Sequence, residues 1–177
     1  MKKARLFLTA VALLFGLLIV FVSLVSTNQV VSFEGSQASN LKLYFGETIL
    51  PDHVVYPFVA AADRVLLWAS PPQEKIKLQL AYSRIRMEYA QALLLKDDSI
   101  LANHALTKSQ KYVSLSALGY LDYNLEDNEL KQEIIKQLET NIAQSQEIIK
   151  QFSVCQRPLA EELNKNNQAL LNQFLSN

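Results

Sequence analysis

The stretch Ile135–Phe152, IKQLETNIAQSQEIIKQF, carries the clearest structural pattern in this chain of 177 residues. Its apolar and small residues recur at steps of three and four: Ile135, Leu138, Ile142, Ser145, Ile149 and Phe152. This spacing places successive side chains on one face of an α-helix. It is also the spacing of a coiled-coil seam, but two heptads are too few to establish one. We therefore expect an amphipathic helix that packs in a bundle.

Recognisable sequence signals mark both ends of this helix. Acidic residues at 126, 127 and 129 are typical of the first turn of a helix, where the helix dipole favours negative charge. Downstream, Pro158 is expected to kink or break the helix. A shorter fifth amphipathic segment should follow, with Leu159, Leu163, Leu170 and Phe174 on its apolar face.

Two helices are expected nearer the N-terminus of the folded part. Pro57 suits a first helical turn and predicts a helix over 57–69. Ser70 and Gln73 predict a capping box for a second helix over 71–96. Its expected apolar face is broad and comprises Leu78, Leu80, Ala81, Ile85, Met87, Tyr89 and Leu94. Charged residues occupy the remainder of that helix: Lys75, Lys77, Arg84, Arg86 and Glu88.

A third helix is predicted over 100–118, between these two regions. The Asp97-Asp98-Ser99 turn supplies its N-cap, and Gly119 is expected to end it. Residues 120–124 then form a connection to the next helix. The buried side should carry Leu101, Ala105, Tyr112 and either Leu115 or Ser116. Together these segments predict an all-α antiparallel bundle of about four to five helices over 50–177.

An uncharged run of 20 residues, Leu6–Val25, precedes the bundle. A helix of about this length spans the hydrocarbon core of a bilayer. Lys2, Lys3 and Arg5 precede the run, so the positive-inside rule places the N-terminus in the cytoplasm. We expect a cytoplasmic segment at 1–5, a transmembrane anchor at 6–26, a tether at 27–49 and an extracytoplasmic domain at 50–177. A cleaved signal peptide is the alternative, although its apolar region is usually only about 7–15 residues.

Composition narrows the classes of function. Four glycines and five prolines among 177 residues favour helices over sheets. Lysine plus arginine and aspartate plus glutamate number 17 each, and three of the basic residues lie before the apolar run. The exported part is therefore slightly acidic, which argues against nucleic acid as a partner. The expected partners are the membrane, through the N-terminal helix, and another envelope protein.

The residues most suited to chemistry form no recognisable motif. His53 and His104 lack metal-ligand spacing to each other or to other ligands. Cys155 is the single cysteine, so no intrachain disulfide is expected. It should lie near the C-terminal end of the fourth helix, where the dipole raises a thiol pKa, and we expect a buried or half-buried, unreactive residue. No catalytic, cofactor-binding or metal-binding residue is predicted.

Paired charges and aromatic residues have ordinary structural interpretations. Asp97-Asp98 should act as a cap, and Glu161-Glu162 as an acidic first turn. Arg84 and Glu88 are spaced for a surface ion pair or for a partly buried one. The aromatic residues are expected mainly in the core, and exposure of several would indicate a partner-binding patch: Tyr56, Phe58, Trp68, Tyr82, Tyr89, Tyr112, Tyr120 and Tyr123.

From Leu50 to about Tyr120 the chain resembles a bacterial family of exported or membrane-anchored domains of unknown function. The resemblance lies in Leu50-Pro51-Asp52, Tyr56-Pro57, the Asp63-Arg64 pair, a proline-containing break and a long helix with Leu80-Ala81, Arg84-Ile85 and Glu88. The chain departs from the family pattern at His53 and Val59. The resemblance implies an all-helical exported domain and carries over no catalytic residue.

Three functions are compatible with these observations. The preferred one is an envelope protein whose helical bundle binds or scaffolds another protein. A sensor with a small-ligand pocket between helices is the alternative. An enzyme is the least favoured, because the polar residues look dispersed. A cluster of His53, Asp63, Arg84 and Glu88 around one cleft would favour an enzyme.

Overall fold

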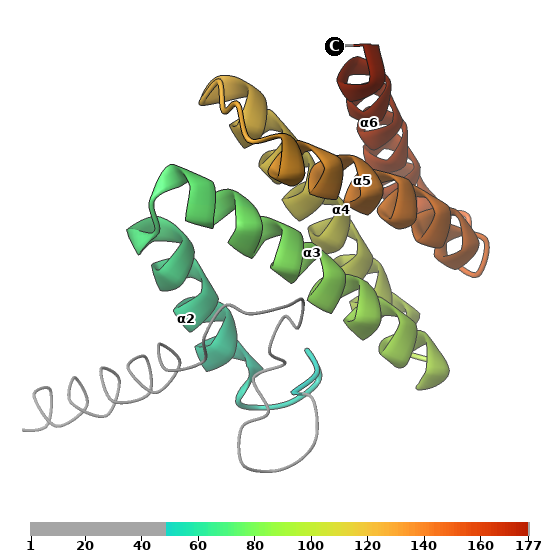
Figure 1. Ribbon diagram of the computed structural model, residues 1–177. Helices are drawn as coiled ribbons and strands as arrows, with labels where there is room; N and C mark the ends of the chain where they lie inside the picture. Colours follow the sequence, from blue (N-terminus) through green and yellow to red (C-terminus); the bar gives the residue numbers. More distant parts are fainter. Residues whose placement is uncertain (1–48, 177) are drawn as a thin grey trace, which may run out of the picture. The chain divides into compact units, whose positions relative to one another are not determined.

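The computed structural model describes residues 49–176. This part contains five helices and no strand: α2 (Tyr56–Ala69), α3 (Pro72–Leu95), α4 (Ser99–Asp122), α5 (Asn128–Ile149) and α6 (Arg157–Ser176) (Figure 1). The all-α prediction is confirmed for these residues. The predicted anchor at 6–26 and nearly all of the predicted tether at 27–49 lie outside them. Between residues 49 and 176, none of the helices has the length and apolar character needed to cross a membrane.

The α3–α4 hairpin forms the centre of the bundle. Ser83 on α3 donates to the carbonyl of Ser109 on α4 at 2.9 Å, and Ser109 donates back to the carbonyl of Ser83 at 2.7 Å. Such reciprocal bonds require the two backbones to approach closely, which small side chains allow. A second close approach occurs at Gly119, where an added Cβ would lie 3.3 Å from Cγ1 of Ile76. The two contacts together show that α3 and α4 run antiparallel.

Helices α5 and α6 complete the bundle by packing on α4 and on each other, and α5 also contacts α3. Two apolar clusters result. One includes Leu80, Val113, Ile134, Leu138 and Phe174, and the other includes Met87, Leu93, Leu106, Ile148 and Phe152. A layer of buried polar side chains, contributed by all four long helices, lies between the two apolar clusters: Ser83, Ser109, Gln110, Asn141, Ser145, Asn164 and Asn167.

Asparagine and serine hydrogen bonds hold this polar layer together. Asn141 of α5 donates to both hydroxyls of the α3–α4 pair, at 3.2 Å to Ser83 and 2.8 Å to Ser109. On the α6 side, Gln110 donates to the carbonyl of Ala160 at 2.9 Å, and Asn167 donates to the carbonyl of Gln110 at 3.3 Å. Only one helix register satisfies all of these bonds, so the layer fixes the alignment of the four long helices.

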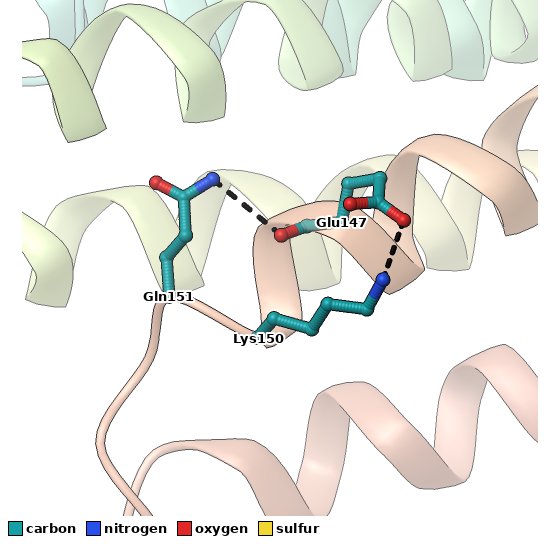
Figure 2. A network of polar contacts seen from close by, with 3 residues as sticks. All are labelled: Glu147, Lys150 and Gln151. Carbon is teal, nitrogen blue, oxygen red and sulfur yellow. Dashed lines mark hydrogen bonds and ion pairs between the residues drawn. The ribbon is translucent and has the colours of Figure 1, made fainter.

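Helix α5 ends at Ile149, well before Pro158, which corrects the predicted break. Figure 2 shows its last turn, where exposed Lys150 donates to the Glu147 carboxylate at 2.6 Å and Gln151 donates to the Glu147 carbonyl at 3.4 Å. Arg157 then donates to the carbonyls of Phe152 and Lys150, at 2.8 and 3.1 Å. These bonds satisfy carbonyls left free at the end of the helix. Pro158 lies in the first turn of α6, where its missing N–H costs nothing.

Two other predicted helix boundaries are wrong. Helix α4 continues through Gly119 to Asp122, because this glycine makes room for Ile76 instead of ending the helix. Ser70 does not cap α3; its hydroxyl donates to the carbonyl of Leu66 at 2.7 Å, and Pro71 is the N-cap residue. Gln73 donates to the Asp127 carboxylate at 2.9 Å instead of completing a capping box. The predictions of Pro57 in a first helical turn and of Asp98 as a cap are confirmed.

The predicted buried face is confirmed for α5 and shifted for the others. Residues 138, 142, 145, 149 and 152 are buried, and Ile135 is half-buried. On α3 the fully buried row is Ile76, Leu80, Ser83, Met87, Ala90 and Leu93, whereas residues 78, 81, 85 and 89 are only half-buried. On α4 Ser116 is buried and Leu115 exposed, and on α6 Ala160, Asn164 and Asn167 take the place predicted for Leu159. The shift arises because small and amide side chains occupy the closest helix contacts.

Candidate functional site

A buried ion pair joins α2 to the bundle. The guanidinium of Arg86 on α3 lies 2.5 Å from Oδ2 of Asp63 on α2, and the two side chains are only 4% and 10% exposed. The phenol of Tyr82 is close enough to the Asp63 carboxylate to lower its pKa. Among the described helices, the backbone of α2 closely approaches that of α3 alone (Figure 1). The pair is therefore the main polar attachment of α2.

Tyrosine rings surround the guanidinium of Arg86. The rings of Tyr56 and Tyr89 each lie with their centroid 5.2 Å from the Arg86 Cζ atom, a distance suited to cation–π attraction. The two rings meet edge to face with centroids 6.4 Å apart. The ammonium of Lys108 on α4 lies 5.8 Å from the centroid of the Tyr56 ring. Arg86 is thus held by one carboxylate and two aromatic rings.

Burial dominates the protonation of this group. It raises the pKa of Asp63, and the charge of Arg86 and the nearby phenol of Tyr82 oppose that rise. Burial also raises the pKa of the Tyr82 phenol, so this hydroxyl stays protonated and able to donate. The pKa of Lys108 is lowered, first by burial and then by the charges of Arg86 and Arg64. Since the Asp63 carboxylate is already paired with Arg86, the arrangement suits a structural joint better than proton transfer.

The outward face of α2 is apolar. Large side chains on it are exposed: Phe58 at 76%, Trp68 at 86%, and Val65 and Leu66 at a little under half. At about 100° per residue, Phe58, Val65 and Trp68 fall within roughly 80° of one another, opposite Tyr56 and Asp63. We call Phe58, Val65 and Trp68 the α2 face. Several of the aromatic residues are buried, as predicted. Phe58 and Trp68 are exposed, and exposed aromatic residues indicate a partner-binding patch.

A second apolar surface lies at one end of the bundle. The α3–α4 turn and the α5–α6 turn are joined there by Gln156, which donates to the Ser99 hydroxyl at 3.2 Å and accepts from Asn103 at 3.0 Å. Four large apolar residues on or beside these turns are exposed: Leu95, Ile100, Val154 and Leu159. We call them the turn surface. Leu95 and Val154 are the most open, at 89% and 78%.

The opposite end of the bundle carries a surface hollow of about 420 Å³. The end of α4, the start of α5 and the end of α6 form it. Its lining combines aromatic and aliphatic residues with one acid and one base: Tyr120, Leu121, Leu125, Glu126, Asn128, Lys131 and Phe174. It differs from the apolar pocket expected for a sensor because charged and amide groups share the wall.

The candidate ligands and nucleophile are scattered over the bundle. His53 lies in the turn before α2, where its Nδ1 accepts a hydrogen bond from the amide of Val55 at 3.2 Å. His104 is exposed on α4. Within residues 49–176 no group of three or more His, Cys, Asp or Glu side chains is arranged to hold a metal ion. Cys155 lies in the α5–α6 turn and is exposed, so the prediction of a buried or half-buried thiol at a helix end is wrong.

The charged residues singled out from the sequence do not lie together in one site. Asp98 accepts from the amide of Leu101 at 3.0 Å as expected of a cap. Glu161 and Glu162 are both exposed on α6. Arg84 and Glu88 form no ion pair in the part of the chain that the structure describes. The bond that links α2 to α3 involves Arg86, so the four residues named for an enzyme are not brought together around Asp63.

Sequence reasoning missed Arg86 and the polar layer. A signal for Arg86 exists, because Tyr82, Arg86 and Tyr89 follow steps of four and three and share one face of α3. The Asp63-Arg64 pair, with the only acid of the helix, also interrupts the otherwise apolar sequence YPFVAAADRVLLWA. Buried positions such as Ser83 and Asn141 follow the same steps as their apolar neighbours, but polar residues at those steps are not normally assigned to a core.

Comparison of the chain with known protein families, with curated proteins and with solved structures finds no match. The resemblance over Leu50–Tyr120 therefore stays a prediction. The function has to be argued from the surfaces of the bundle.

Proposed function

We propose that this chain is a membrane-anchored, extracytoplasmic helical module that binds another envelope protein. The observation that carries the proposal is the turn surface. Leu95, Ile100, Val154 and Leu159 are large apolar residues that a helical bundle would normally bury, and they lie on two turns held in place by Gln156. Exposed apolar groups on a rigid support are typical of a protein-binding site.

The proposed anchor is the uncharged run Leu6–Val25, with Lys2, Lys3 and Arg5 on its cytoplasmic side. It would hold the bundle at the outer side of the membrane. Of the three surfaces described above, the turn surface combines exposure with hydrogen bonds that fix both of its segments. It is thus suited to a partner with a complementary apolar surface and a polar rim.

Cys155 provides a direct test because it is the only cysteine and is exposed between Val154 and Gln156. We would label full-length protein in its native membrane with a photoactivatable maleimide at Cys155 and identify the crosslinked product. We expect one reproducible protein partner. The double substitution Ile100→Ser with Val154→Ser should reduce its yield at least about tenfold, as expected for residues at the centre of an interface.

Leu115→Ser with Leu118→Ser is the matched control, because it removes exposed apolar surface from the far end of α4, away from the turn surface. This control should leave the Cys155 crosslink unchanged. A crosslink that is insensitive to both double substitutions would contradict a specific interface at the turn surface. Crosslinking of Cys155 to lipid alone would do so as well.

A ligand-sensing function is the second candidate, and the hollow beside Tyr120, Lys131 and Phe174 supports it. Its size falls within the range of about 300–1,000 Å³ usual for small-molecule sites. Its one acid and one base, Glu126 and Lys131, together with its apolar residues would suit a ligand that is both polar and partly apolar. Screening for compounds that raise the melting temperature, followed by Lys131→Ala, tests this function; hits that survive the substitution would contradict it.

A further inference from the structure

Helix α2 has an unusual distribution of side chains. The face that packs on α3 contains its buried residues, Tyr56 and the charged Asp63. The opposite face contains Phe58, Val65 and Trp68 in exposed positions. A surface helix of a water-soluble bundle normally has the reverse arrangement. Helix α2 is therefore built to be covered by something apolar on its outer side.

The charged residues around α2 indicate what kind of surface covers its exposed apolar side. Arg64 is the only exposed charged residue of α2, since Asp63 is buried against Arg86. Lys108 of α4 lies over the ring of Tyr56, on the side of α2 that faces the bundle. The α2 face is thus bordered by one cation, Arg64, and has no acid of its own. An apolar face with tryptophan and a basic edge is the composition of helices that lie in a membrane interface.

The length of chain before α2 makes a membrane accessible. Only 23 residues separate Val25, the end of the uncharged run, from Ile49. Such a segment spans at most roughly 80 Å when fully extended. A chain anchored through Leu6–Val25 therefore allows α2 to reach the bilayer surface. This step depends on the anchor of the proposed function.

We propose that α2 lies in the membrane interface of the bilayer that holds the anchor. Phe58, Val65 and Trp68 enter the region between headgroups and acyl chains, and Arg64 faces anionic headgroups. The Asp63–Arg86 pair transmits this attachment to α3 and so orients the bundle on the membrane. The turn surface stays in water, available to a protein partner.

Trp68 tests the proposal directly because it is the only tryptophan of the chain. Full-length protein would be reconstituted into vesicles of phosphatidylcholine and phosphatidylglycerol, with the phosphatidylcholine brominated at the headgroup end of its acyl chains. We expect the bromine to reduce Trp68 emission at least about twofold, because interfacial helices bury their apolar face roughly 5–10 Å deep. Acrylamide in the aqueous phase should quench this emission only weakly.

Two variants sharpen the result. Phe58→Ser with Val65→Ser keeps the fluorophore and should abolish quenching by bromine while restoring quenching by acrylamide. Leu115→Ser with Leu118→Ser removes exposed apolar groups from α4 instead and should leave both signals unchanged. Replacing phosphatidylglycerol by phosphatidylcholine should weaken the bromine effect in the wild type, and less so in Arg64→Gln.

Failure of the anchor and failure of this inference give different results. Release of the full chain from vesicles by alkaline carbonate would overturn the anchor, and the inference with it. Retention of the chain with Trp68 open to acrylamide and insensitive to bromine would overturn the inference alone. Protection of Trp68 from both quenchers would also overturn it, and would show that a protein, such as a second copy of this chain, covers the α2 face.

Discussion

At the residue scale, the Asp63–Arg86 pair is the contact on which the position of α2 depends. Both charges are nearly inaccessible to water, and the cation is enclosed by the rings of Tyr56 and Tyr89. A buried ion pair adds little net stability compared with apolar residues of the same size, but loss of one partner leaves the other charge unpaired. The pair therefore contributes more to the specific position of α2 on α3 than to the stability of the fold.

The substitution Asp63→Ala tests this role. We expect it to lower the free energy of unfolding by about 3 kcal/mol, because Arg86 would stay buried without a carboxylate. Urea denaturation measures the loss. Hydrogen exchange should show the amides of α2 losing protection before those of α4, since the backbone of α2 closely approaches only α3 in the described bundle.

The double variant Asp63→Leu with Arg86→Leu is the control for the same pair. It replaces both charges by apolar groups that can pack between the tyrosines, so at least half of the stability lost in Asp63→Ala should return. If the double variant is as unstable as the single one, then shape at this position matters more than the unpaired charge, and our account of the pair is wrong.

Asp127 gives a prediction for pH dependence. Its carboxylate accepts the amide of Leu130 at 3.0 Å at the start of α5, and this bond, followed by that from Gln73, lowers its pKa below the ordinary value of 3.8. The folded state therefore favours the ionised form. This contribution is present above the unfolded pKa and is lost as pH falls through the lower folded value.

Asp127→Asn should flatten the dependence of the melting temperature on pH between about pH 5 and pH 2, because the neutral amide caps without titrating. Gln73→Ala is the control: it removes the weaker partner and keeps the bond to Leu130, so most of the slope should stay. A full wild-type slope in Asp127→Asn would assign the effect to other carboxylates.

At the scale of elements, the polar layer decides how the four long helices align. Each member of the Ser83–Ser109–Asn141 group makes at least two hydrogen bonds to another helix. Two other buried amide oxygens, Oε1 of Gln110 and Oδ1 of Asn164, have no partner among residues 49–176. The layer thus contains both well-paired and unpaired groups, which should respond oppositely to substitution.

Asn141→Leu and Asn164→Leu form a matched pair of changes. Asn141→Leu should cost about 1–3 kcal/mol of stability, because Ser83 and Ser109 lose a shared donor inside the bundle. Asn164→Leu should change stability by less than about 0.5 kcal/mol or increase it, because an unpaired buried oxygen is removed. Chemical denaturation measures the free energy of unfolding of both variants. Equal losses of stability would contradict this account of the layer.

At the scale of the whole molecule, α6 closes the core. Leu171 and Phe174 complete the cluster around Leu138, and Ala160 completes the cluster around Phe152. Removal of residues 157–177 would expose both clusters and leave the amide of Gln110 without the Ala160 carbonyl. Deletion of α6 should therefore abolish cooperative unfolding, seen as loss of a sigmoidal melt in circular dichroism with helix content partly retained.

A shorter deletion separates this effect from a general sensitivity of the C-terminus. Removal of residues 175–177 keeps Leu171 and Phe174 and should leave the melt cooperative. A cooperative melt after loss of the whole of α6 would mean that α3, α4 and α5 form a core by themselves.

The sequence by itself determined the helical class and most helix positions. Steps of three and four residues are imposed by the geometry of a single helix, so the α5 face, with Leu138 and Ile142, could be predicted without knowledge of its neighbours. Caps act within one turn, and Asp98 was accordingly identified as the cap of α4. Such local features need no tertiary information.

Only the tertiary structure decided which polar residues are buried and which apolar ones are exposed. Ser83 and Asn141 are buried because helices cross closely there, and Arg86 because Asp63 of another helix neutralises it. Gly119 stays helical because Ile76 needs its space. Trp68 and Val154 are exposed because no described helix packs over them. Each of these outcomes depends on a contact between distant segments, and a single sequence does not record the partner.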